Sequence, residues 1–463
     1  MKRIINFVAA AILSLTAAAQ TPDYSASMIR SHGEEWSAGK SWDYVSGLVA
    51  KTILMYCRQY PDDELAAEAY GWCKTYADNS IDPSGNFYNF KKGSLDNIAS
   101  GKVLFDLYAR ESAVAPASGD RYRQAADYLY RYLRNDYTRI SLDEGKDCFI
   151  HKNSYPYQMW LDGLYMGAAF YAEYLSVFAP DDEEGWADIA LQFTTIHSHT
   201  YDASKSLCYH GWSAKPSDSN SFWANRSEPF KGCSREFWGR GMGWYAAALV
   251  DVLELMPRSH ADYGELAAIF AQVSDGIARW QDDASGVWYQ LLQYDSSFVS
   301  AKGRRNYLEA SASSMFTYAL LKGIRLGLLD DAEWGPLAMK AYEGLLDTFI
   351  TEESGGRVDI HNICRSAGLG PAYNLERNGS ADYYLDGSDV NIVSNEGKGI
   401  GSFIMASLEY ERYLAGESAL RPVLADDPTA VRFYDLSGRR LSAAPKGLYI
   451  EQRGEVATKK LGR

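Results

Sequence analysis

The sequence carries few positive charges for its length. It contains 46 Lys and Arg residues against 60 Asp and Glu residues, which gives a formal net charge of −14. Nucleic-acid binding requires a basic face, so this balance argues against nucleic acid as a partner. A polyanionic polymer is also repelled at long range. A small anionic ligand in a local cationic pocket is still compatible with the composition, because salt screens distant charges beyond about 10 Å.

Cysteine pairs of the kind that bind zinc or carry redox chemistry are absent. None of the six cysteines falls in a Cys-x-x-Cys pair. His197 and His199 stand two positions apart and do not share a helix face, which argues against a metal site. We therefore predict no metal and no cofactor. A large core needs no disulfide bonds, so we expect buried free thiols, with any pairing left open, at Cys57, Cys73, Cys148, Cys208, Cys233 and Cys364.

Long hydrophobic runs are also missing beyond the first residues. The run from Ile4 to Leu15 is too short to span a bilayer, and it is preceded by Lys2 and Arg3. Small residues follow it at 17–19, and no lipobox cysteine follows. This pattern predicts a signal peptide over 1–19 and an exported protein, either periplasmic or at the cell surface or secreted. We expect no membrane span in the rest of the chain.

Helical patterns fill most of the remaining sequence, separated by short turn-rich breaks such as 82–86 and 282–286. The recurrence of two helices and a loop with aromatics is a degenerate internal repeat. Six such hairpins predict an all-α fold, the (α/α)6 barrel, over 20–418. Two long loops, 202–237 and 355–395, are expected to form one mouth of the barrel. The expected helices cover 43–59, 62–78, 94–111, 119–135, 157–178, 182–198, 240–256, 262–282, 308–327, 332–350 and 396–414.

The character of the chain changes in its last part, 419–463. Short strands and turns are expected over 430–441 and 446–450. This part resembles the C-terminal sorting segments of secreted Bacteroidetes proteins, although it is short for a complete sorting domain. The alternative is a small β-appendage packed on the barrel, and both interpretations stay open.

One acidic residue stands out within the stretch 155–167, which reads Y-P-Y-Q-M-W-L-D-G-L-Y-M-G. Apolar positions after Pro156 predict a buried helix, and Asp162 lies in its first turns beside Trp160 and Tyr165. An ionised acid in such surroundings is costly unless it is paired. Asp162 is therefore either a hydrogen-bonded residue near a helix start or a group kept for chemistry.

A second stretch, 234–244, reads S-R-E-F-W-G-R-G-M-G-W. Trp offers a face for a sugar ring, and Arg offers a fork for a carboxylate. Together the two stretches resemble glycoside hydrolase family 105, the unsaturated rhamnogalacturonyl hydrolases, whose W-x-D-G/T-L-x-M and W-x-R-G-x-G/N-W elements match 160–166 and 238–244. The resemblance covers roughly 30–415. It implies the same (α/α)6 barrel.

The resemblance also implies a site. Asp162 is the expected acid, and Asp96 matches the second acid of the family, although an N-cap Asp is the alternative for that position. Two carboxylates that lie close together do not both ionise cheaply, so one pKa rises, whereas the helix N-terminus acts in the opposite direction. The expected substrate-binding residues are His151, Lys152, His210, Trp238, Arg240, Trp42 and Tyr44.

The family removes a 4,5-unsaturated uronic acid from the non-reducing end of oligosaccharides that a lyase has released from pectin (rhamnogalacturonan). Asp162 would protonate C4 and water would add at C5, with no metal. The expected partner is thus an unsaturated acidic oligosaccharide. An ordinary inverting glycosidase, a polysaccharide lyase on a similar toroid and a non-catalytic glycan-binding protein are the alternatives. The leaving sugar, its linkage and the oligomeric state stay open.

Overall fold

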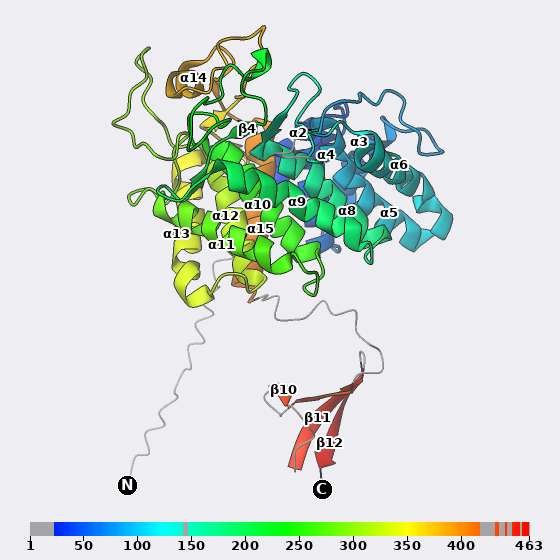
Figure 1. The fold of residues 1–463 in the computed structure, drawn as a ribbon. Helices are drawn as coiled ribbons and strands as arrows, with labels where there is room; N and C mark the ends of the chain where they lie inside the picture. The colour runs from blue at the N-terminus through cyan, green and yellow to red at the C-terminus, as the bar shows by residue number, and fades with distance from the viewer. Residues whose placement is uncertain are drawn as a thin grey trace, which may run out of the picture.

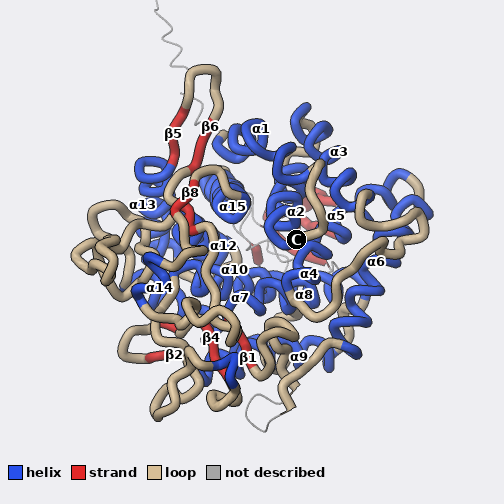
Figure 2. The backbone as a smooth tube through the Cα atoms, turned by 90° about the horizontal axis from the view of Figure 1, so that it is seen from above, coloured by secondary structure: helices blue, strands red, loops and turns tan. Residues whose placement is uncertain are grey.

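The computed structural model describes residues 23–141, 147–416, 431–434, 440–441, 447–453 and 456–462. The predicted signal peptide, 1–19, therefore lies outside the described residues. Within them, twelve helical segments alternate along the chain between an outer and an inner ring (Figures 1 and 2). No helix in this part of the chain has both the length and the apolar character needed to cross a membrane.

The inner ring closes on itself, because each inner segment contacts the next and the last contacts the first. Two of these segments are interrupted by short turns of tighter or wider helix. The inner segments are α2 (Tyr44–Gln59), α4–η1–α5 (Asp96–Ala99, Ser100–Lys102 and Val103–Val114), α7–η4–α8 (Leu161–Gly163, Leu164–Ala168 and Ala169–Phe178), α10 (Gly239–Leu255), α12 (Ala310–Arg325) and α15 (Gly397–Leu414). Six hairpins in a closed ring confirm the predicted (α/α)6 barrel.

The outer ring packs against the inner ring, and its helices keep one polar face toward solvent. Several start at an aspartate whose carboxylate accepts backbone N–H groups of the first turn, as Asp63, Asp182 and Asp330 do. The outer segments are α1 (Tyr24–Ser37), α3 (Glu64–Asp78), α6 with η3 (Asp120–Arg131 and Tyr132–Asp136), α9 (Glu183–Thr200), α11 (Tyr263–Arg279) and α13 (Asp331–Phe349). A short η2 (Pro116–Gly119) precedes α6.

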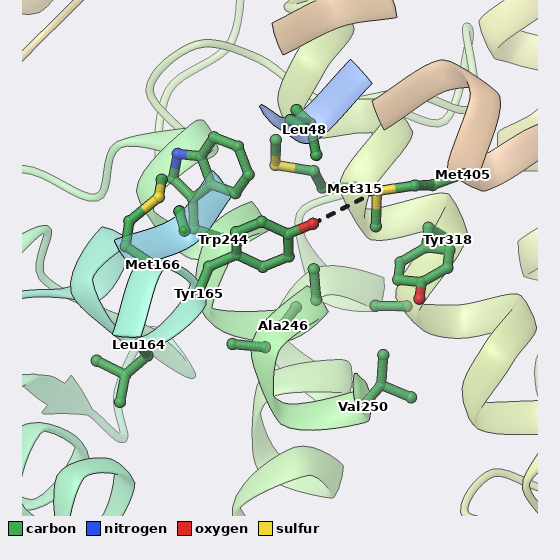
Figure 3. Packing of buried hydrophobic residues seen from close by; sticks show 14 of the residues in the cluster. Leu48, Leu164, Tyr165, Met166, Trp244, Ala246, Val250, Met315, Tyr318 and Met405 are labelled. Atoms are coloured by element: carbon green, nitrogen blue, oxygen red, sulfur yellow. Dashed lines mark hydrogen bonds between the residues drawn. The ribbon is translucent and has the colours of Figure 1, made fainter. Parts of the chain in front are cut away.

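The inner helices are buried on nearly all sides, as helices in the middle of a large core are. Close approach requires small residues: a Cβ on Gly47 of α2 would lie 2.8 Å from the Cα of Ser100. Inside the ring, Tyr165 packs near Trp244 and points its hydroxyl at the sulfur of Met405, 3.8 Å away (Figure 3). The barrel interior is therefore a packed core, and any site has to lie at an end of it.

Eleven of the helices confirm the sequence prediction within a few residues. The helix that the prediction missed is α1, and it completes the twelve. Its signals are Asp23, whose carboxylate accepts the N–H of Ala26, and the apolar pair Met28 and Ile29. The prediction was also wrong at 157–160. Gln158–Trp160 form β1, which pairs with β4 (Gly211–Ser213), so the helix begins only at Leu161.

Short hairpins and loops cover the end of the barrel where the inner helices begin (Figure 1). Both long loops lie there, since His210 of the first contacts the start of α7 and Cys364 of the second contacts the start of α10. The elements are β2 (Tyr201–Asp202) with β3 (Leu207–Cys208), η5 (Ser219–Ser221), β5 (Ile350–Glu352) with β6 (Val358–Ile360), β7 (Ile363–Cys364) with β8 (Ile392–Val393), and α14 (Ala381–Asp386).

Strands lie in both expected ranges of the last part of the chain, and a further strand that was not predicted follows them. They are β9 (Val431–Tyr434), β10 (Arg440–Leu441), β11 (Gly447–Arg453) and β12 (Val456–Gly462), paired antiparallel in the order β10-β9-β11-β12. A sorting role for these strands stays a prediction. The six cysteines are all buried free thiols, as expected.

Candidate active site

The six inner segments all run in the same direction, because each is separated from the next by one outer helix. Their first residues therefore meet at one end of the barrel, beneath the loops (Figure 2). Tyr44 opens α2. The charges that act on it come from the starts of four other inner segments, namely from Asp96, Arg240, Glu396 and Asp162. The positive ends of the helix dipoles face this mouth, which favours carboxylates and anionic ligands there.

Asp162 lies in the first turn of α7, and its partner is a histidine from the first long loop. His210 Nε2 lies 3.0 Å from Asp162 Oδ2, and Leu161 N–H donates to the carbonyl of His210, which fixes the loop against the helix start. Burial raises the pKa of the Asp162 carboxyl, but the charge and the hydrogen bond of His210 outweigh it, so that this pKa lies below its usual range. In the free protein, Asp162 is therefore a carboxylate.

His210 is itself held from its other side. The hydroxyl of Tyr384, in α14, lies 2.6 Å from His210 Nδ1, and both side chains are fully buried. When Nε2 donates to the Asp162 carboxylate, Nδ1 is the ring atom that shares a hydrogen bond with the Tyr384 hydroxyl. The sequence did not point to Tyr384, since its loop carries no motif around it.

Asp96 begins α4 and forms an ion pair. Lys152 Nζ lies 2.5 Å from Asp96 Oδ2, and a β-bridge between Ser94 and Lys152 brings the two side chains together. The N-cap alternative is not what the structure shows, because Leu95 occupies the N-cap position and Asp96 is already helical. Lys152 keeps its charge: burial acts against it, but Asp96 raises the pKa of Lys152 above its ordinary value.

His151 lies between the two acids. Its Nε2 is 3.6 Å from Asp96 Oδ1, its charge is also coupled to Asp162, and its ring stacks on Trp160 at 4.4 Å between centroids. Burial lowers the pKa of His151 to about 4, even though Asp96 acts in the opposite direction. His151 is therefore neutral near neutral pH and can donate to, or accept from, a sugar hydroxyl.

Arg240 lies in the first turn of α10 and is buried. Its Nη1 donates to the carbonyl of Cys364 and to Ser311 Oγ, at 3.3 Å for the latter, and lies 3.9 Å from Glu309 Oε1. The guanidinium carbon lies 4.7 Å above the ring of Trp238. Arg240 is thus held at the mouth by β7 and by the start of α12. Its role toward the substrate stays a prediction.

Glu309 and Gln290 are further residues that sequence reasoning missed. The Glu309 carboxylate caps α12 through Ser311 and Ala312, accepts the N–H of Cys364 and faces Arg240. Gln290 accepts the indole N–H of Trp238 at 3.2 Å and donates to the carbonyl of Tyr384. These residues hold Arg240, Trp238 and Tyr384 in place. The only signal in the sequence was that Glu309 precedes a helix.

Trp42 and Tyr44 complete the set at the start of α2. Trp42 donates its indole N–H to the carbonyl of Asn97 at 2.9 Å and stacks on Tyr76. Burial raises the pKa of Tyr44, and Asp96 adds to this effect, so its hydroxyl stays protonated. The structure therefore brings all nine predicted residues to the same end of the barrel. Among the described residues, no cluster of three or more His, Cys, Asp or Glu has the geometry of a metal site.

Comparison with known proteins agrees with this geometry. The model of Glycosyl Hydrolase Family 88 matches residues 23–414. The chain belongs to this family, together with the related family 105. It is 35% identical to the solved family 105 glycoside hydrolase from C. acetobutylicum, with a TM-score of 0.73, and the match covers 84% of this chain and 99% of the other.

Two curated proteins are also similar to this chain. Over 225 residues the chain is 36% identical to Protein Atu3128 of Agrobacterium fabrum, which covers 48% of this chain and 89% of that protein. Over 291 residues it is 26% identical to the unsaturated rhamnogalacturonyl hydrolase YesR of Bacillus subtilis, which covers 62% and 72%. As a family 88/105 glycoside hydrolase the protein is an enzyme, which sets aside the interpretation as a non-catalytic glycan-binding protein.

Proposed function

We propose that the protein hydrates the C4=C5 double bond of a 4,5-unsaturated uronic acid at the non-reducing end of lyase-generated rhamnogalacturonan oligosaccharides, and thereby releases that sugar. The observation that carries this proposal is the different environment of the two carboxylates at the mouth. His210 stabilises Asp162, whereas Lys152 pairs with Asp96. Distinct environments are what acid–base chemistry with two carboxylates requires. The name of the B. subtilis relative supports the choice of substrate.

The negative charge of the substrate's own carboxylate prepares Asp162 for the first step. Binding of this anion beside Asp162 brings a second negative charge into a buried site, which raises the pKa of Asp162. Asp162 then takes up a proton and transfers it to C4 of the enol ether. Water adds at C5, and the resulting Asp162 carboxylate, assisted by Asp96, accepts the proton of the attacking water. The hemiketal at C5 opens, and the bond to the leaving sugar breaks.

The remaining residues bind and orient the sugar. Arg240 would pair with the uronate carboxylate. The rings of Trp238 and Trp160 both pack against His210 and would lie beside the sugar. His151 is neutral and supplies a hydrogen bond without adding charge. His210, Trp238 and Arg240 are all buried, which limits the access of water to this side of the site.

Ultraviolet absorbance of the double bond separates the candidate reactions. Incubation with an unsaturated uronyl disaccharide is expected to remove this absorbance, while a saturated disaccharide with the same linkage is left intact. An ordinary inverting glycosidase would cleave the saturated compound. A polysaccharide lyase would instead create absorbance from a longer saturated polymer. Cleavage of the saturated disaccharide or a rise in absorbance would therefore overturn the proposal.

A further inference from the structure

A groove of about 540 Å³ lies beside the candidate active site, at the same end of the barrel. It runs between the loop that precedes α2 and the loop that follows α3, and its walls include Lys40, Trp42, Phe87, Tyr88 and Lys91. This volume falls within the range of roughly 300–1,000 Å³ that is typical of ligand pockets. None of the residues assigned above to the catalytic step lines it.

The groove adjoins the catalytic residues, because one of its lining residues is the chain neighbour of Asp96. Asn97 lines the groove and directly follows Asp96, and its carbonyl accepts the indole N–H of Trp42. The side-chain amide of Asn97 donates to the carbonyl of Lys91, which ties the far wall to the start of α4. A ligand that reaches from Asp96 toward solvent on this side therefore enters the groove.

The side chains on the way from Arg240 to the groove differ in exposure. Arg240 is 2% exposed, the side chain of Asp96 is 15% exposed and Tyr88 is 58% exposed. The end near Arg240 is thus closed, and it fits the terminal sugar of a chain. The remaining sugars of the chain have to leave toward the open end, past Asp96 and Trp42.

The groove has the chemistry of a saccharide site. Trp42, Phe87 and Tyr88 offer aromatic surface, and Phe87 packs edge-on against Trp42 at 5.0 Å. Aromatic faces hold sugar rings, and the asparagines at the walls supply hydrogen bonds to hydroxyls.

The charge of the groove is opposite to that of the whole molecule. Lys40 and Lys91 line it, and Lys91 forms no ion pair with any residue that the structure describes. Its single carboxylate, Asp43, already caps α2 by accepting the N–H groups of Val45 and Ser46. In a protein with a net charge of −14, a local excess of lysine points to an anionic ligand.

We propose that this groove binds the leaving-group side of the oligosaccharide beyond its first sugar, and that Lys91 and Lys40 recognise a uronate carboxylate there. The inference rests on the proposed function, because it needs a substrate with an unsaturated sugar at its non-reducing end. An unsaturated disaccharide ends before the groove, whereas an unsaturated tetrasaccharide with a uronate in its leaving portion fills it. The enzyme is therefore selective for longer acidic substrates.

The test compares kcat/KM for an unsaturated disaccharide and an unsaturated tetrasaccharide. The wild-type enzyme is expected to prefer the tetrasaccharide by about tenfold. Tyr88→Ala and Lys91→Ala are each expected to remove most of this preference and to leave the disaccharide value within about twofold. Both side chains are exposed, so neither variant threatens the fold. The effect of Lys91→Ala should vanish on a tetrasaccharide whose leaving-group uronates have been reduced to neutral sugars.

Two matched variants serve as controls. Lys92→Ala removes the neighbouring lysine, which lies over the ring of Tyr132 outside the groove. Tyr373→Ala removes an exposed tyrosine from the loop before α14, on another part of the mouth. Both should keep the wild-type preference. Loss of the preference in Tyr373→Ala but not in Tyr88→Ala would place the leaving chain elsewhere and overturn the inference.

The assays distinguish a failure of the proposed function from a failure of the groove proposal. If the disaccharide is not consumed at all, the proposed function is wrong. If it is consumed but the tetrasaccharide is not preferred, or if Lys91→Ala and Tyr88→Ala keep the preference, the function stands and the groove proposal is wrong.

Discussion

His210 and Tyr384 lie 174 positions apart in the chain, yet the Tyr384 hydroxyl is 2.6 Å from His210 Nδ1. This contact fixes the imidazole ring with its Nε2 pointing at Asp162, 3.0 Å from Oδ2. The histidine that lowers the pKa of the proposed acid is therefore held in place by a tyrosine from a distant part of the chain.

Tyr384→Phe tests this coupling. Without the hydroxyl, His210 loses the contact that holds its Nε2 toward Asp162, and the pKa of Asp162 rises. We expect kcat to fall by roughly tenfold and the alkaline limb of kcat/KM to move to higher pH. Tyr383→Phe removes the neighbouring hydroxyl and should leave the pH profile in place. An unchanged profile in Tyr384→Phe would show that the contact is only structural.

The pH dependence of the wild-type enzyme tests the order of events at Asp162. The pKa of this carboxyl is below its usual range in the free protein, so the protonated fraction, and with it kcat/KM, falls as pH rises above that low value. Bound substrate raises the pKa, so the same limb in kcat should lie at higher pH. If kcat and kcat/KM fell at the same pH, this would contradict the protonation of Asp162 on substrate binding.

Arg240 is proposed to bind the uronate, and it also faces the buried carboxylate of Glu309. Arg240→Ala should lower kcat/KM by an amount equivalent to about 2 kcal/mol or more, mainly through KM. It should also lower the melting temperature, because the buried Glu309 carboxylate loses its cation. The double variant Arg240→Met, Glu309→Gln should recover stability but not activity. Recovery of activity as well would show that Arg240 does not bind substrate.

Lys102 gives a prediction about stability. Its Nζ is buried without a hydrogen-bond partner in the described residues, 3.3 Å above the ring of Tyr165, and burial lowers its pKa to about 7. Lys102→Met should therefore raise the free energy of unfolding by about 1–2 kcal/mol at pH 7. The unfolded chain binds more protons than the folded one between pH 7 and about 10, so wild-type stability rises there and the gain shrinks.

Lys322→Met is the matched control for that variant. Lys322 is equally buried, but its Nζ lies 2.7 Å from both Asp251 and Glu254. Its removal should destabilise the protein by about 3 kcal/mol or more. Denaturant unfolding of the two variants measures both changes. A loss of stability in Lys102→Met would mean that the contact with Tyr165 outweighs the cost of burying the amine.

Much of the fold was predictable because helical periodicity is local. The inner helices are buried on nearly all sides, whereas the outer helices keep one polar face. Turn residues mark the breaks between successive helices. The helix start at 157–160 was not predictable, because β1 forms only by pairing with β4, some fifty residues later. The helix α1 was missed because it adjoins the apolar leader pattern and carries few strong apolar positions.

The site was predictable to the extent that its residues begin helices within recognisable motifs. Asp162, Asp96 and Arg240 each lie in the first turn of an inner segment, and His210 lies in the long loop 202–237 that was expected at the mouth. The supporting residues, Tyr384 and Glu309, were not predictable. Their importance comes from contacts with distant parts of the chain, such as that between Glu309 and Cys364, which the barrel creates and which leave no local pattern.

The most direct test of the account is the rate at which Asp162→Asn removes the double-bond absorbance of an unsaturated uronyl disaccharide. The substitution keeps the size of the side chain, and circular dichroism should match that of the wild type. If Asp162 protonates C4 and then assists the attack of water, two steps lose their catalyst, and kcat should fall by about a thousandfold or more. A folded Asp162→Asn protein with near wild-type turnover would contradict the assignment of Asp162 and of the site built around it.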